Sequence, residues 1–171
     1  MRRPAHGGAQ HDYVRWAFEV PGVTRAWLAG SEMGLGTVTL RFAVDGAPHG
    51  PIPNEADLQA VATHIETRAT LGEEREGRPV TAELFVVAPI PAPIDVTLTS
   101  TPDDDATRAT IRAELAELFR RVGVPGGVVP RDAVSQAISL APGLTARHLI
   151  APAADALPSI GVLPVLGDVS W

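Results

Sequence analysis

Glycine and proline divide this chain into short pieces, and this feature most constrains what it can fold into. The sequence has 16 of each in 171 residues, nearly a fifth of the chain. They lie between segments with regular apolar spacing rather than in one block, which predicts many short elements joined by tight turns. Apolar residues make up 45% of the chain, enough to bury a core in one domain or in two small ones.

Charge and cysteine content exclude several classes of protein. The formal charge is -6, with acidic residues spread along the chain and no lysine, so a nucleic-acid partner is not expected, because such proteins concentrate positive charge on one face. The absence of cysteine excludes disulfides, thiolate metal sites and cysteine nucleophiles. Prolines interrupt the longest apolar stretches, so no membrane partner is expected. The N-terminus lacks the apolar run of a secretory signal, so we expect synthesis in the cytoplasm.

The sequence pattern of residues 12–88 predicts a first lobe that contains, in order, a helix, two strands, a second helix and a third strand. A short helix at 12–19 should stop at Pro21-Gly22. Residues 23–28 and 36–44 alternate apolar and polar side chains, which predicts a hairpin with one solvated face. Asn54 is placed to cap a helix whose apolar residues recur at helical spacing. The last strand of this lobe is expected at 80–88.

A proline-rich segment at 89–93 separates this lobe from a second one at 94–171. The segment is too dense in proline for a central strand, so we expect a stiff extended joint. Asp103, Asp104 and Asp105 supply capping oxygens and negative charge at the start of a helix over 106–122. The other expected elements of this lobe are a strand at 94–99, a helix at 132–140, and strands at 144–150 and 162–171.

These elements predict an α+β protein of two small lobes, each with helices packed on a mostly antiparallel sheet. The expected organisation has a flexible N-terminus at 1–11, lobes at 12–88 and 94–171, and the joint at 89–93.

The sequence offers little that predicts chemistry. The five histidines show no metal-ligand spacing on a predicted helix, and His6, His11 and Asp12 are more simply explained as polar residues near a terminus than as a chelate. The acidic run 103–105 is better explained by helix capping than by cation binding. The glycine-rich segment 31–36 precedes a strand rather than a helix, which favours a hairpin turn over a phosphate loop. We therefore expect no metal, no cofactor and no small-molecule substrate.

Aromatic residues near the N-terminus are the most informative side chains. Tyr13, Trp16 and Trp27 form either a core cluster beneath the first hairpin or, in the sharper hypothesis, anchors of an interface. The mixed-charge loop from Glu73 to Arg78 is either a docking loop or a solvated segment. The candidate interface residues are Arg15, Trp16, Trp27, Glu73, Glu74, Arg75 and Arg78.

A set of short motifs, in order along nearly the whole chain, resembles the phage baseplate J-like proteins, the Mu-type baseplate wedge family of contractile tails. In the first lobe the motifs lie at 12–17 (DYVRWA), 20–27 (VPGVTRAW), 36–38 (GTV) and 78–82 (RPVTA). In the second lobe they include 88–89 with 94–96 (AP and IDV), the helix containing Phe119, 141–144 (APGL), 151–152 (AP) and 161–167 (GVLPVLG).

The resemblance implies a structural role without catalysis, as a baseplate wedge component of a contractile phage tail or a related injection device. It implies other baseplate or wedge subunits as partners, with self-association as a further option. Family members are longer and carry an N-terminal half before the Asp12 region that this chain lacks. Two alternatives remain: a small metal-dependent or hydrolytic enzyme that uses His64 and His148, and a free-standing binding module of prophage origin.

Overall fold

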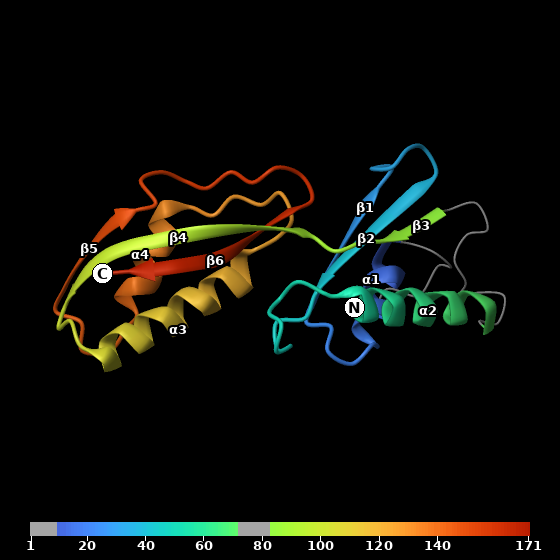
Figure 1. The fold of residues 1–171 in the computed structure, drawn as a ribbon. Helices are drawn as coiled ribbons and strands as arrows, with labels where there is room; N and C mark the ends of the chain where they lie inside the picture. Colours follow the sequence, from blue (N-terminus) through green and yellow to red (C-terminus); the bar gives the residue numbers. More distant parts are fainter. Residues whose placement is uncertain (1–9, 72–82) are drawn as a thin grey trace, which may run out of the picture. The chain divides into compact units, whose positions relative to one another are not determined.

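The structure, a computed structural model, describes residues 10–71 and 83–171 (Figure 1). The chain divides into two compact units, Met1–Pro89 and Ile90–Trp171. Each unit combines helices with one three-stranded sheet, so the expected α+β architecture of two small lobes is confirmed. In the described part of the chain, no helix has the length and apolar character needed to cross a bilayer.

The first unit contains two helices and a three-stranded sheet. Its elements are α1 (Gln10–Phe18), β1 (Arg25–Gly30), β2 (Thr37–Ala43), α2 (Glu55–Leu71) and β3 (Glu83–Val86). The strand order is β1-β2-β3. The β1–β2 hairpin is antiparallel, as expected, whereas β3 pairs in parallel with β2.

Local sequence signals explain where the helices of this unit begin and end. The chain turns after α1 at Gly22, whose φ of 97° is accessible mainly to glycine. Asn54 caps α2 as predicted: its Oδ1 accepts from the Asp57 amide at 3.0 Å, and Asp57 Oδ2 accepts from the Asn54 amide at 2.9 Å. This reciprocal pair satisfies two backbone donors that the helix itself leaves unpaired.

Both helices of the first unit pack on the same face of its sheet. The buried core contains Tyr13 and Trp16 from α1, Phe42 from β2 and Ile65 from α2. The rings of Tyr13 and Trp16 meet edge to face, with centroids 5.4 Å apart, a favoured geometry for aromatic pairs. The core interpretation of these two aromatic residues is therefore confirmed.

The second unit also has two helices and three strands, but in a different order along the chain. Its elements are β4 (Ile90–Thr101), α3 (Asp105–Val122), α4 (Arg131–Ser139), β5 (Ala146–Ala151) and β6 (Val162–Ser170). The strand order is β5-β4-β6. Strand β5 runs antiparallel to β4, and β6 runs parallel to it. Each sheet thus has one antiparallel and one parallel pairing, so the sheets are mixed rather than mostly antiparallel.

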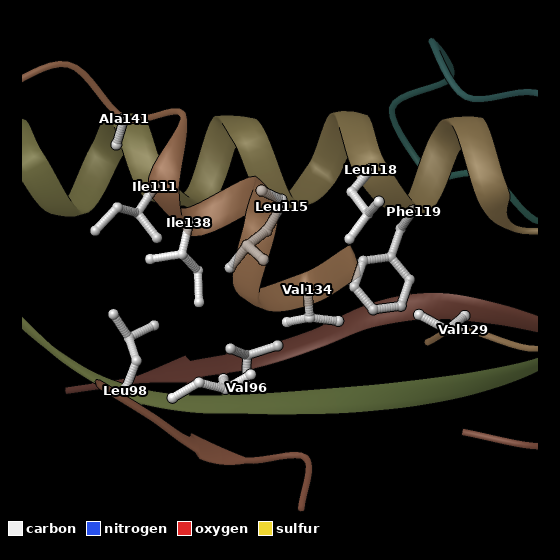
Figure 2. Close-up of a cluster of buried hydrophobic side chains, with 12 residues drawn as sticks. Val96, Leu98, Ile111, Leu115, Leu118, Phe119, Val129, Val134, Ile138 and Ala141 are labelled. Atoms are coloured by element: carbon white, nitrogen blue, oxygen red, sulfur yellow. The ribbon is translucent and has the colours of Figure 1, made fainter. Parts of the chain in front are cut away.

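Helix α3 supplies most of the core of the second unit. Asp104 caps it, accepting from the Thr107 amide at 2.8 Å, as the acidic run predicted. The stripe expected on this helix is buried from Ile111 through Leu115 to Phe119. Figure 2 shows these side chains pointing towards Val96 and Leu98 of β4. The same cluster includes residues of α4, among them Val134 and Ile138.

The proline segment differs from its prediction. Residues 90–93 are extended, but they form the first part of β4 and pair with β6, although β4 lies in the centre of the sheet order. Strand β5 pairs only with residues 97–101 of β4, so Pro91 and Pro93 lie where β6 is the only neighbouring strand among the described residues. Backbone N–H groups point alternately to the two sides of a strand. The Ile90 amide donates to the carbonyl of Gly161, just before β6, at 3.1 Å, so Pro91 and Pro93 are the positions that would direct an N–H away from β6. Both prolines therefore place their missing N–H on the unpaired side.

A hydrogen bond between the Asp95 side chain and the Asp168 amide, which we call the polar latch, interrupts the backbone pairing of β4 with β6. The register shifts between Ile94 and Val96, and the side chain of Asp95 accepts a hydrogen bond from the Asp168 amide at 2.9 Å. Gly167 leaves room for this carboxylate, since a Cβ there would lie 2.2 Å from Asp95 Oδ1 and 3.0 Å from the carbonyl carbon of Ile94. The Asp95 carboxylate thus replaces a backbone acceptor at the irregularity.

Candidate protein-interaction surface

The sheet of the first unit has one face that neither helix covers, which we call the open sheet face. It comprises the half-buried residues Arg25, Trp27, Arg41 and Phe85, which surround Thr39, itself 0% exposed. Ala26 and Leu28 of β1, and Leu84 and Val86 of β3, pack into the core beneath the sheet. Because successive side chains of a strand point to opposite faces, the residues between them point to the other face. Trp27 is opposite Arg41, and Thr39 is beside Phe85.

Arg25 fixes the surroundings of Trp27. Its guanidinium carbon lies 5.2 Å from the centroid of the Trp27 ring, within the range of a cation–π contact. The same guanidinium donates to both carboxylate oxygens of Asp45, at 2.7 and 2.9 Å. Thr24 donates to that carboxylate through its hydroxyl at 2.6 Å. Trp27, which is half-buried, is therefore held beside an arginine whose charge is already paired.

A second arginine of the open sheet face is paired in the same way. Arg41 donates through both terminal nitrogens to Glu32, at 2.6 and 2.8 Å. The hydrogen bonds from Arg41 hold the pKa of the Glu32 carboxyl below its ordinary value, although partial burial acts in the opposite direction. Because two bidentate pairs neutralise both arginines, the open sheet face presents aromatic and planar groups with little net charge.

The Glu32–Arg41 pair predicts a dependence of stability on pH. A carboxyl whose folded pKa is depressed stabilises the fold above its unfolded pKa, and this contribution is lost as the pH falls through the folded value. The unfolding free energy of wild type should therefore exceed that of Glu32→Gln by about 1 kcal/mol at neutral pH. The difference should shrink below pH 4.5, the ordinary value. Urea unfolding at several pH values measures it, and a difference independent of pH would contradict the pairing.

The tip of the β1–β2 hairpin exposes apolar side chains. Leu35 is 99% exposed and Met33 is 51% exposed. The loop that carries them is held in place by Thr37, whose hydroxyl donates to the Gly34 carbonyl at 2.8 Å and accepts from the Met33 amide at 3.2 Å. The tip is thus ordered before any partner arrives, which lowers the entropic cost of binding.

The prediction of Trp16 as an interface residue does not agree with the structure. It is 1% exposed and lies in the core of the first unit. A side chain without accessible surface offers no contact area to a partner, so Trp16 stabilises the unit rather than an interface.

The other interface candidates fall on different parts of the chain. Trp27 lies on the open sheet face, whereas Arg15 is exposed on α1, in the layer on the other side of the sheet, and its guanidinium lies 3.5 Å from Asp12. The structure therefore does not bring these two together. Glu73, Glu74, Arg75 and Arg78 lie outside the described residues.

Sequence reasoning missed three members of the open sheet face. Arg25, Arg41 and Phe85 were not among the candidates, although Arg25 and Trp27 are two residues apart in a predicted strand and must share a face. The alternation in the hairpin therefore contained the signal for Arg25. The position of Phe85 depends on the parallel pairing of β3 with β2, which no local pattern indicates.

The two histidines of the enzyme alternative lie in different units. His64 of α2 contacts the Glu19 carboxylate at 2.9 Å, and Arg68 donates to the same oxygen at 2.7 Å. Partial burial raises the pKa of Glu19, but the hydrogen bonds from His64 and Arg68 outweigh it and lower that pKa. His148 is exposed on β5 of the other unit. Among the described residues, no three His, Cys, Asp or Glu side chains are grouped as metal ligands.

Two family models together match almost the whole chain. The Baseplate J-like central domain matches residues 5–88. The Baseplate J-like protein C-terminal domain matches residues 92–171. The boundary between the two matches falls at the division between the compact units.

Curated relatives of the chain come from bacteria and from a phage. Putative protein JayE of Escherichia coli (strain K12) is 38% identical over 165 residues, which are 96% of this chain and 59% of the relative. Mu-like prophage FluMu protein gp47 of Haemophilus influenzae is 34% identical, and Baseplate protein gp47 of Escherichia phage Mu is 29% identical. Both comparisons cover 100% of this chain and 48% of the relative. The chain thus spans about half the length of these relatives.

Proposed function

This chain belongs to the baseplate J-like family, and from that premise we propose that it is a structural component of a phage tail baseplate or of a related injection device. Its partners are other baseplate subunits. It acts by holding those subunits in a fixed arrangement, and it makes or breaks no covalent bond. Its working location is the assembled baseplate.

The observation that carries this proposal is the match of both compact units to the central and C-terminal domains of one baseplate family. A further argument comes from the relative in phage Mu, which is named as a baseplate protein. The described residues also supply what a scaffold needs, since each unit has its own buried apolar core.

The open sheet face is the surface we assign to subunit contacts in the first unit. Tryptophan and arginine dominate the energetics of many protein interfaces, and charged residues are depleted at interface centres. Trp27 lies on this face, and its neighbours Arg25 and Arg41 are already paired with Asp45 and Glu32. A partner can therefore cover the face without supplying counter-charges for either arginine.

Substitution of Trp27 tests this assignment. The products of the genes that flank this one are purified singly and titrated against the chain by sedimentation velocity. At least one should bind wild type, and Trp27→Ala should weaken that binding by about 30-fold, as expected for an aromatic anchor.

Controls separate an effect on binding from an effect on folding. Because Trp27 is only half-buried, Trp27→Ala should keep the wild-type circular dichroism spectrum. Arg15→Ala, on the other layer, should bind like wild type. If Trp27→Ala binds with wild-type affinity, the open sheet face is not the contact surface. If wild type binds none of the flanking gene products, that result counts against the baseplate function itself.

A further inference from the structure

Strand β1 lies at an edge of the first sheet, and its outer side has no neighbouring strand among the described residues (Figure 1). The Val87 amide donates to the Leu40 carbonyl at 3.0 Å, so the even-numbered residues of β2 direct their backbone groups towards β3. Because these groups alternate between the two sides of a strand, the odd-numbered residues of β2 face β1. Their partners in β1 are odd-numbered too, so the even-numbered residues of β1 direct their backbone groups outwards.

The outward-facing residues of β1 are Ala26, Leu28 and Gly30, which we call the β1 edge. Within the part of the chain that the structure describes, no hydrogen bond to their amides or carbonyls is formed on this side. All three residues keep accessible surface: the first two are half-buried and Gly30 is exposed. Backbone amides and carbonyls require a hydrogen-bond partner, so the β1 edge offers its groups to water or to another strand.

The other sheet edges carry features that discourage strand pairing, whereas the β1 edge does not. Edge strands are usually protected by proline, charged side chains, bulges or short length. Strand β6 contains Pro164 and a register shift, β5 carries exposed Arg147 and His148, and β3 has only four residues. Strand β1 has six residues and no proline, and its one charge, on Arg25, is already paired with Asp45. An extended strand therefore meets no such obstacle in β1.

We propose that the β1 edge pairs with the β1 edge of a second copy of the chain, antiparallel about a twofold axis through Leu28. In this register Leu28 exchanges backbone hydrogen bonds with Leu28 of the second copy, and Ala26 exchanges them with Gly30. All outward backbone groups of the β1 edge are then satisfied, and the two sheets become one continuous sheet. The inference goes beyond the proposed function, because it concerns contact between copies of this chain rather than with other baseplate subunits.

The side chains of β1 fit this register. On the open sheet face, Trp27 of each copy lies opposite Ala29 of the other, so a large side chain meets a small one on both sides of the axis. Beneath the sheet, the half-buried Leu28, which packs against the core, meets Leu28 of the second copy and joins the two cores. Arg25 lies opposite Ser31, so the pairing places no like charges directly opposite each other.

Exposed apolar side chains at both ends of β1 favour a second copy over an unrelated strand. The hairpin tip that follows β1 exposes Leu35 by 99% and Met33 by 51%. Helix α1, which precedes β1, ends at Phe18, whose exposure is 49%. An antiparallel copy brings the hairpin tip of each chain to the end of β1 where α1 of the other chain stops. Twofold pairing therefore gathers these apolar groups at both ends of one contact, where their burial is favourable.

Removal of one outward amide tests the pairing. Sedimentation equilibrium of the chain alone, over a range of concentrations, should show monomer and dimer. Ala26→Pro should weaken the dimer by about 30-fold, because each copy loses one hydrogen-bond donor to the other. Proline is tolerated where a backbone N–H faces away from the neighbouring strand, so the variant should keep the wild-type circular dichroism spectrum.

Single cysteine substitutions test the register, since the chain has no cysteine of its own. Leu28→Cys should form a disulfide-linked dimer on mild oxidation, because the Cα atoms of directly opposite residues in such a pair lie about 5.5 Å apart, within the reach of a disulfide. Ala26→Cys is the matched control on the same side of the sheet. It lies opposite Gly30 of the second copy, so it should stay largely unlinked.

Amide exchange followed by NMR gives a readout that does not depend on any variant. The amides of the β1 edge should exchange rapidly in dilute monomer and slowly in the dimer. The amides of Trp27 and Ala29, which face β2, should be protected in both states and serve as the internal control.

Several outcomes would overturn the proposal. A chain that stays monomeric at every concentration would do so and would leave the baseplate function intact, because that function is tested with other proteins. An unweakened Ala26→Pro dimer, or equal cross-linking of the two cysteine variants, would place self-association on another surface. Slow exchange of the β1 edge amides in the monomer would show that another segment of the same chain pairs with β1.

Discussion

Trp16→Ala is expected to destabilise the first unit by about 3–5 kcal/mol, the usual cost of truncating a buried tryptophan. The side chain is 1% exposed, and its removal leaves a cavity beside Tyr13, Phe42 and Ile65, which belong to the same core cluster. Native-state hydrogen exchange measures the loss separately for each unit, since amides of β2 and of β4 report on different cores.

The matched control for this substitution is Trp27→Ala, the same chemical change on the open sheet face. It should cost much less stability, because the side chain is only half-buried and truncation there creates no closed cavity. Exchange in β4 should be unchanged in both variants. Equal losses of protection in β2 for the two variants would contradict the division of the tryptophans between core and surface.

Gly167→Val is expected to lower the stability of the second unit strongly, although the added side chain is small. Valine has a far higher intrinsic preference for strands than glycine, so propensity alone predicts stabilisation. The added Cβ would instead lie 2.2 Å from Asp95 Oδ1 and 3.1 Å from the Asp95 amide nitrogen. The carboxylate must leave, its bond to the Asp168 amide is lost, and the backbone of β4 must shift. We expect a loss of about 3 kcal/mol in unfolding free energy, at the upper end of overpacking costs, measured by urea unfolding.

A double-mutant cycle with Asp95→Ala separates the two parts of this effect. Removing the carboxylate costs its hydrogen bond to the Asp168 amide, which spans 2.9 Å, but also removes the nearest clash. The effects of Gly167→Val and Asp95→Ala should therefore be smaller together than in sum. Strictly additive losses, or a stabilised Gly167→Val protein, would show that the latch does not have the geometry described.

Local structure was largely predictable from the sequence because its causes are local. Asn54 and Asp104 were recognised as caps since a side-chain oxygen before an apolar periodic run has a direct role at a helix N-terminus. The apolar stripe of α3, from Ile111 to Phe119, follows from helical spacing alone. Glycines between alternating segments likewise indicated the first hairpin.

Pairing between distant strands was not predictable in the same way. The parallel pairs β2–β3 and β4–β6 join segments separated by whole helices, and no residue in either strand specifies the direction of its partner. The proline segment was misjudged for a related reason. Pro91 and Pro93 are acceptable in β4 only because β5 stops short of them, and this depends on where another strand ends.

The candidate surface was predictable only in part. Tyr13, Trp16 and Ala17 are spaced as a helical stripe, so the pattern contained the signal for a core position of Trp16. Trp27 was selected as an aromatic residue, but its role depends on which sheet face the helices leave open.

The most direct test of the central claim is electron cryo-microscopy of the tail particles produced by the gene cluster that encodes this chain. If the chain is a structural baseplate component, its two units will appear in the baseplate, with the open sheet face covered by a neighbouring subunit. Complete particles that lack the chain, or particles in which the open sheet face is exposed to solvent, would contradict it.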